Sequence, residues 1–203
     1  MNNMKLIVIT TEHFFDGETA ALNLLFNNGM ELLHLRKPEA SEAETARFIE
    51  KIRPENHHRI VIHDHFSLTN KFHLKGIHLN RRNNVIPNGF QGTKSLSCHT
   101  FDELEQHPEP DYLFLSPIFD SISKHNYTSR FPEDLLYSLK ERGVINEKVI
   151  ALGGINRHNI HKVKDYGFGG AAVLGSMWED FQNQQDRDIL LTRFQELQYA
   201  ARQ

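Results

Sequence analysis

The chain has 203 residues, of which 39% are hydrophobic and 24% charged, and these values predict one soluble globular domain over residues 1–203. The formal net charge is −3, so charge gives no sign of nucleic-acid binding, and no apolar run is long enough to cross a membrane. A single cysteine, Cys98, rules out an internal disulfide. Together with an N-terminus that lacks a signal-peptide pattern, it favours the reducing cytoplasm.

Eight apolar runs alternate with helical patterns along the chain. The predicted strands are 5–10, 31–36, 59–63, 76–79, 93–98, 112–115, 148–152 and 171–174. The predicted helices are 18–28, 41–52, 67–72, 101–106, 132–141, 156–163 and 188–200. Strands that alternate with helices form parallel sheets, and eight such units favour a closed (β/α)8 barrel. The alternative is an open flavodoxin-like sheet, which would leave some units without a place.

Local signals predict where several helices begin and end. Ser41 and Glu44 have the spacing of a capping box. Thr100 and Asn156 are each placed to cap the helix that follows them. Gly29 is placed to end the first helix.

Polar residues follow the predicted strands at the end where a (β/α)8 barrel carries its chemistry. They are His34 and Arg36, His63 and Asp64, His78 and Asn80, Ser95 and Ser97, and Ser116 with the loop 121–124. This set supplies cations and hydroxyls, which donate to phosphate oxygens, so it suits a phosphorylated substrate. The sequence HDH at 63–65 does not by itself predict a zinc site, because no thiolate cluster or spaced third ligand accompanies it.

Residues 148–176 contain two successive strand–glycine turn–helix units. Gly153 and Gly154 end the first strand, and Gly175 and Ser176 end the second. Glycine lets the backbone N–H groups of a turn come close to a ligand. Turns after the seventh and eighth strands are where such barrels bind phosphate, and we expect a phosphate here. The alternative is that these glycines only allow tight connections.

Seven short segments, in matching order from the first strand to the eighth, resemble the thiamine-phosphate synthase family and its thiazole-tautomerase branch. The segments are LHLRK (33–37), IVIHD (60–64), KGIHLN (75–80), KSLSCHTFDE (94–103), LSPIFDSISK (115–124), VIALGGI (149–155) and GFGGAAVLGS (167–176). The resemblance implies a transferase that joins hydroxymethylpyrimidine diphosphate to a thiazole phosphate. In that reaction the pyrimidine C–O bond ionises, diphosphate leaves with help from Mg²⁺, and the thiazole nitrogen captures the carbocation.

The resemblance also implies roles for single residues. Arg36 would hold the diphosphate, Asp64 would be the first Mg²⁺ carboxylate, and Asn83 stands where the second is expected. The implied substrate- and phosphate-binding residues are Lys37, Ser97, Ser121, Ser123, Gly154, Leu174 and Gly175. The catalytic candidates are His34, Arg36, His63 and Lys124.

Several positions depart from the family pattern and keep alternatives open. The family has glutamine at His34, lysine at Pro38 and asparagine at His63, and its second Mg²⁺ carboxylate is replaced by Asn83. The diphosphate half of the site is therefore weakened, which a tautomerase would tolerate, but the catalytic histidine of that branch aligns with Pro117. One alternative is an isomerase that uses His34 or His63 as proton carrier. Another is a non-catalytic phosphate-binding paralogue. In each case the expected partners are small phosphorylated molecules, neither nucleic acid nor membrane is expected, and a homo-oligomer is left open.

Overall fold

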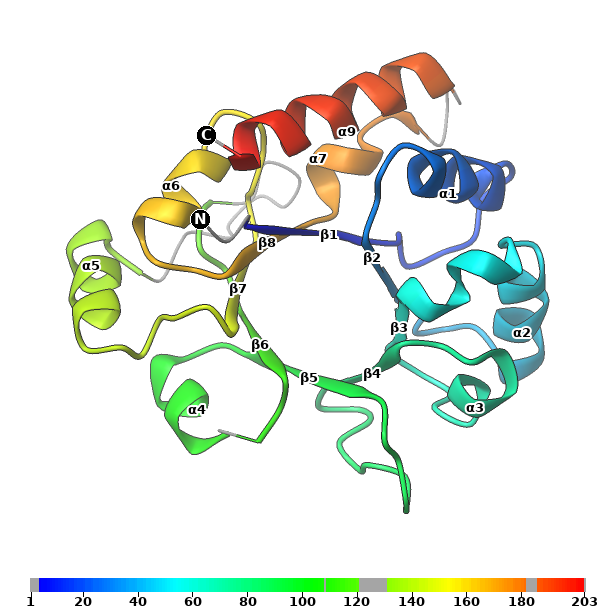
Figure 1. Cartoon of the computed structure of the whole chain (residues 1–203), viewed down its shortest axis with the longest axis horizontal. Coiled ribbons are helices and arrows are strands. Elements are labelled where there is room, and N and C mark those ends of the chain that lie inside the picture. The colour runs from blue at the N-terminus through cyan, green and yellow to red at the C-terminus, as the bar shows by residue number, and fades with distance from the viewer. Residues whose placement is uncertain (1–3, 108, 121–130, 182–185, 203) are drawn as a thin grey trace.

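The computed structural model describes residues 4–107, 109–120, 131–181 and 186–202. Eight parallel strands close into a barrel in the order in which they occur along the chain, and β8 pairs with β1 (Figure 1). The strands are β1 (Lys5–Ile9), β2 (Leu32–Leu35), β3 (Ile60–Ile62), β4 (Gly76–Leu79), β5 (Thr93–Cys98), β6 (Tyr112–Leu115), β7 (Val149–Leu152) and β8 (Gly170–Val173). The predicted (β/α)8 barrel is confirmed.

Helices surround the barrel on its outside (Figure 1). They are α1 (Glu18–Asn27), α2 (Glu42–Glu50), α3 (Leu68–Phe72), α4 (Phe101–Gln106), α5 (Glu133–Glu141), α6 (Ile160–Asp165), α7 (Gly175–Trp178) and α9 (Arg187–Arg202), with the 3₁₀-helix η1 (Pro54–Arg59). The long helix α9 packs against α1, α6 and α7. None of the helices in the described part of the chain has the length and apolar character needed to cross a bilayer.

Side-chain caps start two of the helices as the sequence predicts. The Ser41 hydroxyl accepts from the Glu44 N–H and the Glu44 carboxylate accepts from the Ser41 N–H, which completes the capping box of α2. Thr100 accepts from the Glu103 N–H at the start of α4. Gly29 has φ +92°, a value that favours glycine, just beyond the end of α1.

The prediction that Asn156 caps a helix is wrong. The Asn156 side-chain oxygen accepts from the His158 N–H and so forms a turn of its own, and α6 begins later, at Ile160. The Asn159 side chain donates to the carbonyl of Gly154, 2.9 Å away. The connection after β7 is therefore a hydrogen-bonded loop that fixes the position of the glycine turn.

Alternating residues of each strand pack inside and outside the barrel. Inside the barrel, one apolar cluster is formed by Ile7, Ile9, Leu32, Val61, Tyr112, Phe114, Ile150 and Ala172. The outward-facing residues, such as Leu33 and Leu35 of β2, join the larger core beneath the helices. Three polar residues, His34, His78 and Ser95, are also at most 1% exposed. One part of the interior is therefore polar, and these side chains need hydrogen-bond partners there.

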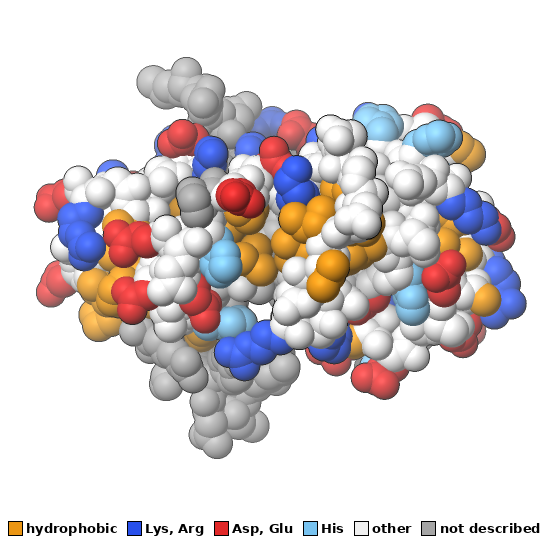
Figure 2. All heavy atoms as spheres, turned by 90° about the horizontal axis from the view of Figure 1, so that it is seen from below, with side chains coloured by type: hydrophobic (Ala, Val, Ile, Leu, Met, Phe, Trp, Pro, Cys, Tyr) orange, Lys and Arg blue, Asp and Glu red, His pale blue; other side chains and the backbone are white. Residues whose placement is uncertain are grey.

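The surface seen from below carries charges of both signs (Figure 2). On this face Lys and Arg side chains alternate with Asp and Glu, and hydrophobic side chains gather near its middle. The charges on this face do not form a broad patch of one sign. The expectation that nucleic acid is no partner stays a prediction.

Candidate active site

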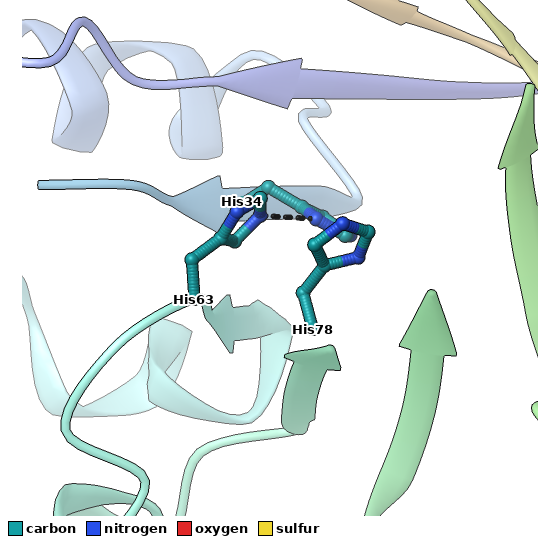
Figure 3. Close-up of side chains that lie close together, drawn as sticks. All are labelled: His34, His63 and His78. Carbon is teal, nitrogen blue, oxygen red and sulfur yellow. Dashed lines mark hydrogen bonds between the residues drawn. The ribbon is translucent and has the colours of Figure 1, made fainter. Parts of the chain in front are cut away.

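Three histidines from neighbouring strands meet inside the mouth of the barrel (Figure 3). His34 lies on β2, His63 directly follows β3 and His78 lies on β4, and each is at most 5% exposed. His34 Nδ1 is 2.9 Å from His63 Nε2, and the rings of His63 and His78 stack with centroids 4.1 Å apart. The alternation of residues along the strands places His34 and His78 on the inner face. His63 joins them one residue beyond the end of its strand.

Hydroxyl groups occupy the other nitrogens of His34 and His78. Tyr112 Oη lies 2.7 Å from His34 Nε2. Ser95 Oγ lies 2.8 Å from His78 Nδ1, and Ser97 Oγ lies 2.7 Å from His78 Nε2. Ser95 and Ser97 come from β5, which pairs with β4, so their bonds to His78 join neighbouring strands. Tyr112 comes from β6, so its bond to His34 on β2 crosses the barrel interior. Ser97 is thus close to the histidines, and Tyr112 belongs to the site although the sequence did not single it out.

Burial keeps all three imidazoles neutral. Loss of water lowers the pKa of His34 and His63 well below 6.5, and the neighbouring His78 adds to both shifts. Burial, followed by the charge of Arg36, lowers the pKa of His78 to about 3. Burial also raises the pKa of Tyr112, so its hydroxyl stays protonated. The three histidines and Tyr112 therefore supply donors and acceptors without a buried charge.

The three histidines are close enough to be considered as a metal site, since one ligand nitrogen from each lies within 4.8 Å of the others. Zn²⁺ needs free lone pairs that converge on one point at about 2.0–2.1 Å. Both nitrogens of His34, both of His78 and Nε2 of His63 are already hydrogen-bonded. The stacked rings of His63 and His78 lie within 27° of parallel, so their in-plane lone pairs do not converge well. The arrangement fits a hydrogen-bond network better than a metal centre.

Asp64 lies beside the histidines at the mouth and is 8% exposed. Its Oδ1 accepts from Asn83 Nδ2 at 2.7 Å and from Arg82 at 3.3 Å. Its Oδ2 is buried and has no hydrogen-bond partner among the described residues. An unused buried carboxylate oxygen fits a cation ligand, because leaving it unpaired is costly.

Asn83 does not fit the role of a second metal ligand in its present orientation. Its amide nitrogen donates both to Asp64 and to the carbonyl of His63, at 2.7 and 3.2 Å. A cation shared with Asp64 would need the amide oxygen on that side, and turning the amide over would break both bonds. The site thus offers Mg²⁺ one carboxylate, and Mg²⁺ often binds through one or two carboxylates together with substrate phosphates.

Arg36 is at the mouth of the barrel, as predicted. Its guanidinium pairs with Glu12 at 2.7 Å, and the arginine side chain is 26% exposed. The charges of Arg36 and Arg82 both contribute to the lowered pKa of His63, so two cations flank this histidine. An anionic ligand placed there would be attracted by both.

Lys37 does not fit the phosphate-binding role that the sequence predicted. Its Nζ lies 2.7 and 2.8 Å from the two carboxylate oxygens of Glu18, and both side chains are 1% exposed. The ammonium also donates to the carbonyl of His13 and lies over the rings of Phe14 and Phe48. Lys37 is therefore part of a buried ion pair between the barrel and α1. Ser121, Ser123 and Lys124 lie outside the described residues.

The two late glycine turns lie at the carboxyl ends of β7 and β8. No hydrogen bond engages the backbone N–H groups of Gly154, Gly175 or Ser176 among the described residues. The Ser176 hydroxyl is buried and likewise unpartnered in this part of the chain. The Trp178 indole donates to the carbonyl of Ile9 at 2.7 Å and so holds α7 against β1. These donors suit an anionic oxygen, and Ser176 is a phosphate candidate that the sequence prediction did not include.

Glycine at 154 is also required by packing. A Cβ there would lie 2.4 Å from the carbonyl oxygen of Asp120 and 2.6 Å from that of Phe119, and φ is +65°. The tight connection therefore exists whether or not a ligand binds.

A separate surface groove of about 480 Å³ lies at the other end of the barrel, where β6 and β7 begin. Leu104, Arg142 and Val149 are among the residues that line it, and it contains none of the predicted site residues.

Comparisons with known proteins agree with this geometry. A family model described as thiamine monophosphate synthase matches residues 6–177. A crystal structure of thiamine phosphate pyrophosphorylase from Bacteroides thetaiotaomicron is 40% identical in sequence, with a TM-score of 0.90 and 98% of each chain covered. The thiamine-phosphate synthase of Shouchella clausii is 25% identical over 186 residues, which cover 86% of this chain and 88% of that protein. Thiamine phosphate pyrophosphorylase from Pyrococcus furiosus, at 19% identity and a TM-score of 0.75 over 98% of this chain and 96% of its own, shares the fold.

Proposed function

The chain belongs to the thiamine monophosphate synthase family, and we propose that it is a transferase that joins hydroxymethylpyrimidine diphosphate to thiazole phosphate with release of diphosphate. The observation that favours transfer over isomerisation is Asp64. A carboxylate that has one buried oxygen without a partner among the described residues, and that is flanked by arginines, suits a diphosphate and its cation. An isomerase has no need of it.

The diphosphate would lie at the ends of β2 and β3. Arg36 and Arg82 supply positive charge there, and Asp64 supplies one ligand for Mg²⁺. When bound, Mg²⁺ would neutralise charge that develops on the departing diphosphate. The arginines act in the same way, and because they are held by Glu12 and Asp64 they are oriented before the substrate arrives. Ionisation of the pyrimidine C–O bond is thereby favoured.

The thiazole phosphate would lie at the late glycine turns. The N–H groups of Gly154, Gly175 and Ser176 and the Ser176 hydroxyl can donate to its three oxygens. Fixing the phosphate at the ends of β7 and β8 would orient the thiazole nitrogen toward the pyrimidine carbon across the mouth. Leu174 enters this proposal through its backbone, and Lys124 and the serines near it remain candidates from the sequence alone.

We also propose that the protein acts in the cytoplasm, as one domain, on small phosphorylated substrates. The single cysteine supports this proposal, because one cysteine allows no internal disulfide. A homo-oligomer remains open.

A thiazole tautomerase is the second candidate, because the neutral imidazoles of His34 and His63 could carry a proton. Pro117 stands where that branch has its histidine, so His34 or His63 would have to act instead. Three assays separate the candidates. Incubation with both phosphorylated substrates and Mg²⁺ should yield thiamine phosphate. Isomerisation of the thiazole carboxylate without Mg²⁺ would favour the tautomerase, and thermal stabilisation by thiazole phosphate without either turnover would favour a binding protein.

A further inference from the structure

The hydroxyl of Thr10 makes two hydrogen bonds to the backbone of one residue, Arg36. Thr10 Oγ1 accepts from the Arg36 N–H at 2.9 Å and donates to the Arg36 carbonyl oxygen at 3.1 Å. Thr10 directly follows β1 and is fully buried, and Arg36 directly follows β2. We propose that Thr10 is a positioning residue, which fixes the backbone of Arg36 so that its guanidinium is presented to the diphosphate at the mouth of the barrel.

The two hydrogen bonds hold the backbone on both sides of the Arg36 Cα. The N–H belongs to the planar peptide group before the Cα, and the carbonyl belongs to the planar peptide group after it. Among the described residues, neither group has a backbone partner. Because one oxygen ties both peptide planes, φ and ψ of Arg36 are restricted, and so is the direction in which its side chain leaves the backbone.

The hydroxyl, rather than the shape of threonine, is what this position requires. Alternation along β1 puts Ile9 inside the barrel and Val8 and Thr10 outside it, toward the helices. Val8 and, on the next strand, Leu35 belong to the apolar core there. Valine has nearly the shape of threonine and would pack in this layer. It would, however, leave the N–H and the carbonyl of Arg36 without a partner.

The loop that begins at Thr10 also holds the far end of the arginine. Glu12, two residues later, pairs with Arg36 Nη1 at 2.7 Å. The side chains are 47% and 26% exposed, and an ion pair as exposed as this contributes little free energy. A diphosphate can therefore replace the Glu12 carboxylate, whereas the buried hydrogen bonds of Thr10 stay in place. The guanidinium is thus oriented before the ligand arrives, as electrostatic stabilisation of a leaving group requires.

The first test measures binding without turnover. Because the role of the diphosphate rests on the proposed function, the probe is inorganic diphosphate, titrated calorimetrically into the full-length protein. Thr10→Val removes the hydroxyl and should weaken diphosphate binding about tenfold, and Thr10→Ser keeps it and should bind within about twofold of the wild type. Wild-type affinity in Thr10→Val, equal losses in both variants, or no diphosphate binding by the wild type would overturn the proposal.

A second pair of variants covers the case in which Thr10→Val does not fold. Thr10→Cys has the size of Thr10→Ser, but a thiol donates and accepts more weakly than a hydroxyl. Thr10→Cys should therefore bind diphosphate more weakly than Thr10→Ser. Equal affinities of these two variants would count against the role of the hydroxyl.

The second test shows whether Thr10 acts through Arg36. In an Arg36→Ala background the guanidinium is absent, while Arg82 remains to bind the anion. Adding Thr10→Val to this background should cause no further loss of diphosphate affinity. Losses that add would mean that Thr10 acts on the mouth in some other way, and would overturn the proposal.

Turnover separates this role from a general loosening of the fold. With both substrates and Mg²⁺, Thr10→Val should lower kcat about tenfold and raise the KM for hydroxymethylpyrimidine diphosphate, while the KM for thiazole phosphate stays unchanged. A similar rise in both KM values would contradict the proposal. Diphosphate binding that depends on the Thr10 hydroxyl, without any turnover, would support the positioning role and contradict the proposed function.

Thr45→Val is the matched control. Thr45 is 2% exposed, and its hydroxyl donates to the Ser41 carbonyl at the start of α2, at 2.9 Å. The same chemical change is thus made at a buried threonine that does not contact Arg36. This variant should keep the wild-type affinity for diphosphate. A loss as large as that of Thr10→Val would show that any buried threonine has this effect, and would overturn the proposal.

Discussion

Asn83 turns its amide nitrogen toward Asp64, and the two side chains are joined by a hydrogen bond of 2.7 Å from Nδ2 to Oδ1. The carboxylate also pairs with Arg82, whose side chain is 48% exposed. In the free protein these two donors replace the charge neutralisation that a cation would give. Asp64 is thus held in place by neighbours that compete with Mg²⁺ for one of its oxygens and leave the other unused.

Replacing Asn83 by aspartate should create a stronger Mg²⁺ site. The variant places a second carboxylate against Asp64, so the free protein should lose thermal stability through like-charge repulsion. Mg²⁺ should restore it, and the apparent Mg²⁺ affinity should rise about tenfold or more. A Mg²⁺ titration followed by thermal unfolding measures both effects. Asn84→Asp, one residue away, is the control and should change neither. An unchanged Mg²⁺ response in Asn83→Asp would place Asn83 outside the metal site.

Replacing Ser176 by alanine should weaken phosphate binding without harming the fold. The hydroxyl is buried and unpartnered among the described residues, so its removal should leave the free energy of unfolding unchanged or raise it. The affinity for thiazole phosphate should fall about tenfold, because one donor is lost. Calorimetric titration measures the affinity for thiazole phosphate, and urea unfolding measures the free energy of unfolding. Ser138→Ala, on the exposed face of α5, should change neither. Wild-type affinity in Ser176→Ala would exclude this hydroxyl from the site.

Replacing Lys37 by methionine should destabilise the protein and leave phosphate affinity unchanged. The substitution strands the Glu18 carboxylate in a site where both partners are 1% exposed, and breaking such a pair costs about 3–5 kcal/mol. Adding Glu18→Leu removes the stranded charge and should recover most of the loss. Urea unfolding measures both variants. A loss of phosphate affinity in the folded Lys37→Met protein would restore its role as a ligand.

Lowering the pH should destabilise the protein through the buried histidines. In the folded state the pKa of His78 is about 3, and the pKa values of His34 and His63 are also well below 6.5. The unfolded chain therefore binds protons below pH 6.5 that the folded chain excludes, so stability is present above that pH and is lost below it. Below about pH 6.5 each histidine lowers the free energy of unfolding by at most about 1.4 kcal/mol per pH unit, so the three together lower it by at most about 4 kcal/mol per pH unit.

Urea unfolding between pH 7 and pH 5 tests this dependence. Replacing His34 by glutamine should reduce the slope by about one proton, whereas His58→Gln, at an exposed position, should not. A free energy of unfolding that stays constant over this range would mean that the imidazoles are not held neutral.

The architecture could be predicted because the signals for it are local. Apolar runs gave β4, β5 and β6 with the bounds that the structure has, and the capping box of Ser41 and Glu44 is present. The 3₁₀-helix Pro54–Arg59 was not predicted, and the bounds of the short helix α7 were not predicted. They lack the repeated apolar spacing on which such predictions depend.

The candidate site could be predicted only in part, because its decisive contacts join distant residues. Strand alternation placed His34 inside the barrel, but its partner Tyr112 is 78 positions away. Lys37 follows a strand, as a ligand would, yet its ammonium is paired with the carboxylate of Glu18, which lies 19 positions earlier in the sequence. The sequence spacing of these residues does not indicate such a pairing, because the partners come together only in the packed fold.

A crystal structure with thiazole phosphate bound tests most directly whether the two late glycine turns hold a phosphate ester opposite Asp64. We expect phosphate density within hydrogen-bonding distance of the Gly154 and Gly175 N–H groups and the Ser176 hydroxyl. Density elsewhere, for example in the groove lined by Leu104 and Arg142 at the opposite end of the barrel, would contradict it.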